Sequence, residues 1–237
     1  MLILAGALLV SYIFPIALYL FLRSAHKGDE EYKKDCSRLL LHGLLLGFPV
    51  FGFSLLCNIV FRITHISDAF PFAETVFKAF ILHAFSEELM KYLLARKTIR
   101  KNHSRVSFLD LMSFTAISAI GFELMEAVIY FFSTNIPQIL VRGITNMHAA
   151  LGLTMGFILA KKYKKNPKAS AAVAVLVPTL FHGVYDLCLD DALVERWGGL
   201  SLLIAILCLI LTIAVYFFMA KAGKKEYYTH PLFPEAE

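Results

Sequence analysis

Charged residues are scarce in this sequence. Asp, Glu, Lys and Arg make up 17% of the 237 residues, whereas a soluble domain of this length keeps about a quarter of its residues charged. Apolar residue types reach 58% and come in long runs that short polar segments separate. The runs predict repeated crossings of a lipid bilayer and exclude an ordinary water-soluble domain.

Several motifs of well-understood chemistry are also missing. The four cysteines form no CxxC or other ligand spacing, which argues against a disulfide or a cysteine-held metal. Neither GxSxG, typical of serine hydrolases, nor HExxH, typical of zinc hydrolases, occurs. No repeat or long linker divides the chain, so we expect a single transmembrane domain over 1–222 and a cytoplasmic tail over 223–237.

Seven apolar runs predict an all-α, polytopic transmembrane helical bundle. The first run has no basic segment before it and no small-residue cleavage site, so we interpret it as an uncleaved helix rather than a signal peptide. The predicted spans are 2–22, 39–61, 76–95, 108–132, 139–160, 169–189 and 199–220.

The basic residues predict the orientation of these spans. Lys and Arg gather in the loops after the first, third and fifth spans and in the tail, while the other loops hold very few. By the positive-inside rule the N-terminus faces out and the C-terminus faces the cytoplasm. Because the basic residues lie in short loops between apolar runs, the net charge of +5 indicates membrane orientation and not nucleic-acid binding.

Ionisable side chains interrupt four of the spans. An ionised group at the centre of a membrane helix costs roughly 2.5–3.5 kcal/mol on insertion scales. Five carboxylates facing lipid would cost more than about 10 kcal/mol, so they must face protein or water. The residues are His83, Glu87, Glu88 and Lys91 in the third span, Glu123 and Glu126 in the fourth, His148 in the fifth, and His182 and Asp186 in the sixth.

Helical spacing brings these residues onto one stripe of each span. The stripes are His83, Glu87 and Lys91; Phe122, Glu126 and Tyr130; His182 and Asp186; and His148 with Gly152 and Gly156, a small-residue face that allows close helix approach. A shared cavity would satisfy all four stripes. At 1.5 Å per residue, Glu126 and His182 lie about 10 Å below the outer boundary, which predicts a site in the outer half of the bilayer.

Four segments resemble the motifs of the PrsW family of intramembrane proteases, which is distantly similar to the CAAX prenyl proteases and the CPBP proteins. The segments are 87–91 (EELMK), 121–130 (GFELMEAVIY), 142–156 and 182–186 (HGVYD), in order on separate spans. One departure is Ala127, which stands where the second motif has Asn.

The resemblance implies a bacterial plasma-membrane protease. Its expected partners are the bilayer and a single-span membrane protein of the anti-sigma-factor type, in which it makes the first cut on the outer side of the membrane. That location agrees with the depth predicted from the residues.

Peptide hydrolysis needs a base for water, a donor for the oxyanion and an acid for the leaving amine. We expect Glu87 to activate water and Glu88 to orient it or share the proton; the alternative is that Glu87 and Lys91 are only a buried ion pair. Asp186 would fix the tautomer of the neighbouring histidine. The expected catalytic residues are Glu87, Glu88, Glu126, His148, His182 and Asp186, and the supporting ones are Lys91, Phe122, Tyr130 and Arg142.

We expect no cofactor, because a second glutamate and Lys91 suit metal-free acid–base chemistry. The alternative is a zinc site held by Glu87, His148 and His182.

Two other classes of protein also fit the intramembrane residues. Intramembrane carboxylates and histidines also occur in proton-coupled transporters, but those often carry internal repeats. A non-catalytic scaffold could replace these residues by apolar ones and become more stable.

Overall fold

The structure of the chain is a computed structural model. It describes residues 2–24, 26, 28–64, 71–101, 106–133, 145–162 and 167–190, and positions 203, 206, 207, 210, 214 and 217. Within these residues every regular element is a helix, which confirms the all-α prediction. The helices are α1 (Leu2–Arg23), α2 (Glu30–Thr64), α4 (Pro71–Phe77), η1 (Lys78–Phe85, a π-helix), α5 (Ser86–Lys101), α6 (Phe108–Ser133), α8 (Met147–Lys162) and α9 (Pro167–Cys188).

Four of the described helices are long and apolar enough to cross a membrane: α1, α2, α6 and α9. The predicted third span is divided into α4, η1 and α5, and α8 is a shorter apolar helix. The number of seven spans and the orientation of the termini stay predictions. Arg142, most of 199–220 and the tail 223–237 lie outside the described residues.

Helix α2 begins well before the predicted span at 39–61, and its local sequence explains why. The Asp29 carboxylate accepts hydrogen bonds from the backbone N–H groups of Glu31 and Tyr32, at 3.0 and 2.9 Å. Asp is a preferred N-cap residue because it satisfies donors that the first helical turn leaves free. Glu30 and Glu31 also place negative charge at the positive end of the helix dipole.

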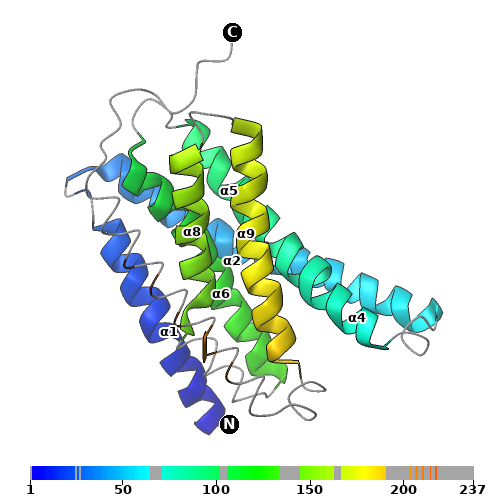
Figure 1. Ribbon diagram of the computed structural model, residues 1–237. Coiled ribbons are helices and arrows are strands. Elements are labelled where there is room, and N and C mark those ends of the chain that lie inside the picture. The colour runs from blue at the N-terminus through cyan, green and yellow to red at the C-terminus, as the bar shows by residue number, and fades with distance from the viewer. Residues whose placement is uncertain are drawn as a thin grey trace.

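Helix α6 lies at the centre of the bundle. It packs against α1, α2, α5 and α8, while α9 packs on α8 and on η1. Figure 1 shows α6 behind α8 and α9, with α1 on the opposite side of the bundle from α4. Any polar group on α6 can therefore meet groups from several helices, which is the condition for a shared cavity.

Small residues allow the close approach of α6 to its neighbours. A side chain at Gly121 would meet the Leu40 carbonyl oxygen and, at 2.8 Å, the Leu44 nitrogen of α2. On α8, a Cβ at Gly152 would lie 2.7 Å from the Thr115 carbonyl oxygen, and one at Gly156 2.6 Å from the Leu111 carbonyl oxygen. The predicted small-residue face of α8 is thus the face that contacts α6, as expected for membrane helices that pack backbone to backbone.

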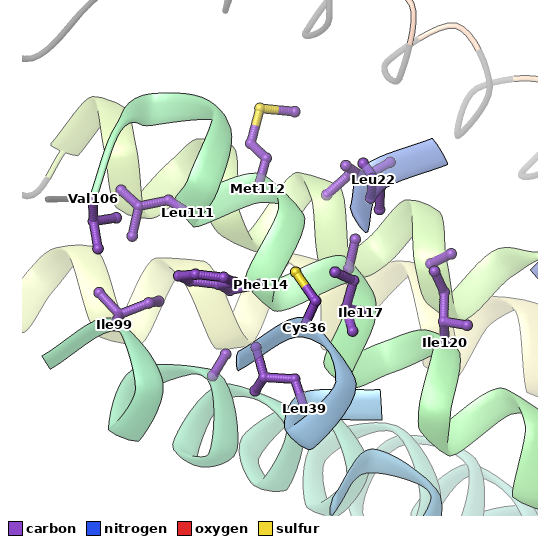
Figure 2. Close-up of a cluster of buried hydrophobic side chains, with 14 of the residues drawn as sticks. Leu22, Cys36, Leu39, Ile99, Val106, Leu111, Met112, Phe114, Ile117 and Ile120 are labelled. Carbon is purple, nitrogen blue, oxygen red and sulfur yellow. The ribbon is translucent and has the colours of Figure 1, made fainter. Parts of the chain in front are cut away.

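Apolar packing holds the half of the bundle that contains the start of α6. Figure 2 shows Cys36 and Leu39 of α2, Ile99 of α5 and Ile117 of α6 in one buried cluster. The start of α6 is closed by a reciprocal cap in which Ser107 and Asp110 exchange hydrogen bonds, with 2.7 Å from the Ser107 N–H to the Asp110 carboxylate. These contacts set the position of α6, on which the polar residues of the next section depend.

We predict that Gly121→Ala destabilises the protein, because the added methyl group must displace α2 backbone atoms. Overpacking of this kind costs about 1–3 kcal/mol. The matched control is Gly52→Ala on α2, where an added Cβ has no neighbour within 4 Å and the change should be neutral or stabilising by up to about 1 kcal/mol. Thermal unfolding in detergent measures both variants, and equal midpoints for the two would contradict the packing described.

Candidate active site

The ionisable residues of four helical segments meet in one buried cluster. Glu87, Glu88 and Lys91 come from α5, Phe122 and Glu126 from α6, His148 from α8, and His182 and Asp186 from α9. Glu88 and His182 are completely buried, and Glu87, Lys91 and His148 are at most 3% exposed. The predicted convergence of the polar stripes is therefore present in the structure.

The ammonium group of Lys91 is the centre of the cluster. Its Nζ lies 2.9 Å from Oε1 of Glu88 and 3.4 Å from Oε2 of Glu87, both on its own helix. It also lies 2.8 Å from Nδ1 of His148 on α8. An ammonium has three donors and no acceptor, so these three contacts use its full capacity.

The contact with Lys91 determines the tautomer of His148. Because Lys91 only donates, Nδ1 of His148 must accept, and the ring proton is then on Nε2. Nε2 lies 2.8 Å from Oε2 of Glu126 and donates to that carboxylate. Lys91, His148 and Glu126 thus form one chain of charge-assisted hydrogen bonds across α5, α8 and α6.

His182 joins the two glutamates of α5 to α9. Its Nδ1 lies 3.0 Å from Oε1 of Glu88, the oxygen that Lys91 also contacts. Its Nε2 lies 3.2 Å from Oδ2 of Asp186 and 3.7 Å from Oε2 of Glu87. Among the described residues Nε2 of His182 and Oε2 of Glu88 have no hydrogen-bond partner, although both atoms are buried.

The approach of α9 to the third-span segment depends on a glycine beside the histidine. A Cβ at Gly183 would lie 2.6 Å from Cε1 of Phe80 on η1, so glycine leaves the room that the Phe80 ring occupies between the two helices. The π-helical hydrogen bonding of η1 also changes the rotation of the residues before Glu87, since each turn holds more residues than in an α-helix. His83 lies on η1 and is half-buried, and its place on one stripe with Glu87 stays a prediction.

The supporting residues have different positions. The Phe122 ring lies 4.3 Å from the Lys91 ammonium and meets the His148 ring edge-to-face at 5.3 Å, so it belongs to the cluster. Tyr130 packs against Leu4 and Ala7 of α1. Arg142 lies outside the described residues.

One residue of the site was missed by the sequence analysis. The Ser118 hydroxyl on α6 donates to the backbone carbonyl of Lys91 at 3.2 Å. The available signal was spacing, because Ser118 precedes Phe122 by four residues and so extends the predicted stripe by one turn.

The donor atoms fit a metal ion. One ligand atom each from Glu87, His148 and His182 lie within 4.8 Å of one another, and two imidazoles with one carboxylate are an established donor set for catalytic zinc. The buried, unpartnered Nε2 of His182 is also available as a ligand. Both nitrogens of His148 already hold hydrogen bonds, so ligation through His148 would replace one of them.

Comparison with known proteins agrees with this arrangement. The profile of the family described as "PrsW family intramembrane metalloprotease" matches residues 36–219, which include every residue of the cluster. The chain belongs to the PrsW family.

Proteins named Protease PrsW share this similarity over most of their length. The one from Halalkalibacterium halodurans is 30% identical over 189 residues, 76% of this chain and 82% of the relative. The one from Clostridioides difficile is 26% identical over 83% of this chain and 84% of the relative. The Bacillus subtilis protein is 24% identical over 73% and 78%, respectively. No solved structure matches the chain.

Family membership and the apolar helices together establish the class of protein. This PrsW family member is a multi-pass membrane protein of bacteria and an intramembrane peptidase. The family match favours the protease interpretation of the sequence over the transporter interpretation.

We predict that Lys91→Met lowers the free energy of unfolding by about 3–5 kcal/mol, because it leaves buried carboxylates without a counter-charge. The double variant Lys91→Met/Glu88→Gln should lose less than the sum of the two single variants, since it removes both charges of the 2.9 Å pair. Denaturation in detergent measures all three proteins. Additive losses would contradict a direct interaction between these side chains.

Proposed function

We propose that this PrsW family member hydrolyses a peptide bond within the membrane with Glu87 as the general base. The observation that carries the proposal is the unequal engagement of the two glutamates. Oε1 of Glu88 is hydrogen-bonded to Lys91 and to His182. Oε2 of Glu87 has only longer contacts, 3.4 Å to Lys91 and 3.7 Å to His182. Glu88 therefore serves as a fixed counter-ion, and Glu87 is the carboxylate left to take a proton.

In the proposed reaction Glu87 removes a proton from water while the water oxygen attacks the scissile carbonyl carbon. The C–N bond then breaks, and the amine nitrogen receives the proton that Glu87 holds. His182 is our candidate for the group that contacts the peptide, because its Nε2 is buried and has no hydrogen-bond partner among the described residues. Oδ2 of Asp186 lies 3.2 Å from the same nitrogen without forming a hydrogen bond, so Asp186 would orient the imidazole and its proton.

Lys91, His148 and Glu126 have a supporting role in this proposal. The hydrogen-bond chain from Lys91 through His148 to Glu126 fixes the ammonium beside Glu88. A fixed positive charge keeps Glu88 ionised and stabilises negative charge that develops nearby in the transition state. Pre-oriented charges need no reorganisation during the reaction, which is why the site surrounds Lys91 with partners on several helices.

The second candidate is a metal-dependent form of the same hydrolysis, favoured by the convergence of Glu87, His148 and His182. These three residues would hold the ion, and zinc would supply a polarised, readily deprotonated water. In that case Glu88 and Lys91 would orient the donors instead of acting on the water.

For the substrate we propose a single-span membrane protein of the anti-sigma-factor type, cut on the outer side of the membrane. Support comes from the resemblance of the four motif segments and from the predicted depth of the site in the outer half of the bilayer. The domain of this activity would be the membrane region 1–222, with 223–237 as a cytoplasmic tail.

Cleavage of a single-span reporter with an anti-sigma-like outer segment tests the proposal. Purified protein in nanodiscs is compared with Glu87→Gln, with and without a zinc chelator, and bound metal is measured in each sample. We expect Glu87→Gln to lower kcat by at least about 100-fold, the usual contribution of a general base. We expect the wild type to keep its activity with chelator.

The matched control is Glu74→Gln, the same chemical change on α4, where Glu74 pairs with Lys78 outside the cluster. It should cleave at the wild-type rate. Activity lost with chelator and restored by zinc would favour the metal-dependent form, and full activity of Glu87→Gln would refute the assigned base.

A further inference from the structure

Buried hydroxyl groups in this bundle usually bond to their own helix. Thr115 on α6, Thr154 on α8 and Thr179 on α9 each donate to the carbonyl four residues earlier, at 2.8–3.0 Å. This is the common arrangement for Ser and Thr inside helices, because that carbonyl is always within reach. A hydroxyl that donates to a carbonyl of another helix instead helps to set the position of the two helices relative to each other.

Ser118 on α6 is such a hydroxyl. It is fully buried, and it donates to the backbone carbonyl of Lys91 on α5 at 3.2 Å. Its own helix offers the Phe114 carbonyl as the local alternative. The hydrogen bond therefore links α6 to the one residue of α5 whose side chain forms the centre of the active-site cluster.

Further along the same face of α6, Phe122 contacts the ammonium of Lys91, and Glu126 contacts His148, the histidine to which Lys91 donates. Phe122 lies over the Lys91 ammonium at 4.3 Å, and Glu126 accepts a hydrogen bond from His148, which in turn accepts one from Lys91. Ser118, Phe122 and Glu126 are spaced by four residues and share one face of α6. This face holds Lys91 at both ends, the backbone by Ser118 and the ammonium by Phe122.

We propose that Ser118 is a positioning residue for catalysis, which fixes the rotation and depth of α5 so that the Lys91 ammonium reaches Glu88 and His148. The proposal rests on the proposed function, because it assumes that Lys91 and Glu88 support the action of Glu87. A lysine side chain is a flexible four-carbon stem, so the position of its backbone decides where its charge lies. Displacements of about 1 Å far from the reacting atoms are known to lower rates strongly.

The test compares Ser118→Ala with Ser113→Ala in the reporter assay, measuring kcat, KM and thermal unfolding for each. Ser113 is a buried residue on the same helix whose hydroxyl interacts with the Tyr32 phenol of α2. It precedes Ser118 by five residues and so lies on a different face of α6. Loss of the hydrogen bond should lower kcat of Ser118→Ala by about 3- to 10-fold with KM unchanged. Ser113→Ala should keep the wild-type kcat.

The outcomes separate this inference from the proposed function. A kcat for Ser118→Ala equal to that of wild type, while Glu87→Gln is inactive, overturns the positioning role and leaves the glutamate mechanism standing. Equal losses in Ser118→Ala and Ser113→Ala, in proportion to their losses in thermal stability, also overturn it, because they show a merely structural role. Activity in Glu87→Gln overturns the proposed function itself.

Discussion

The ammonium group of Lys91 is buried among two glutamates, a histidine and an aromatic ring, and α5 alone does not satisfy it. Its partners on α5 are Glu87 and Glu88, but the shortest contact is with His148 on α8, and Phe122 of α6 lies against its charge. Moving an ion from water into a medium of low dielectric costs several kcal/mol. The site forms only if α5, α6, α8 and α9 come together in one arrangement. The Lys91 ammonium would be unfavourable in the bilayer without its partners, so it favours the packing of these helices that supplies them.

Close packing makes this arrangement possible. Glycines on α6 and α8 let neighbouring backbones approach to distances at which a single added carbon atom would collide, and Gly183 on α9 leaves room for the Phe80 side chain. The hydrogen-bonded polar atoms of the cluster have their partners on the same helix, as Lys91 has in Glu88, or on a neighbouring one, as His148 has in Glu126. Within the cluster, Nε2 of His182 and Oε2 of Glu88 are buried atoms that have no hydrogen-bond partner among the described residues, and Nε2 of His182 lies 3.7 Å from Oε2 of Glu87. That is where a substrate, a water molecule or a metal ion would bring the missing interactions.

The polar cluster could be predicted from the sequence for two reasons. The free-energy cost of placing an ion in lipid and the repeat of the α-helix are both known without the tertiary structure. The residues that carry motif resemblance, Glu87, Glu88, His148 and His182, converge as that reasoning required. The pairings were not predictable, since whether His148 turns to Glu126 or to Glu88 depends on the rotation of α8 against α6. The division of the third span into α4, η1 and α5 was not predictable either, because a π-helix leaves no clear pattern in the spacing of apolar residues. Ser118 was missed because a lone serine in an apolar run usually bonds to its own helix.

The protonation state of the His148 ring shows directly whether the site is organised around Lys91. Nitrogen NMR of histidine-labelled protein in nanodiscs distinguishes a ring nitrogen that carries a proton from one that does not, and the His148 signals are assigned by their loss in His148→Gln. We expect a neutral ring with the proton on Nε2 and a bare Nδ1, because Nδ1 accepts from the ammonium of Lys91 at 2.8 Å. A proton on Nδ1, in either a neutral or a charged ring, would mean that Lys91 does not hold this histidine, and the proposed organisation of the site around Lys91 would be wrong.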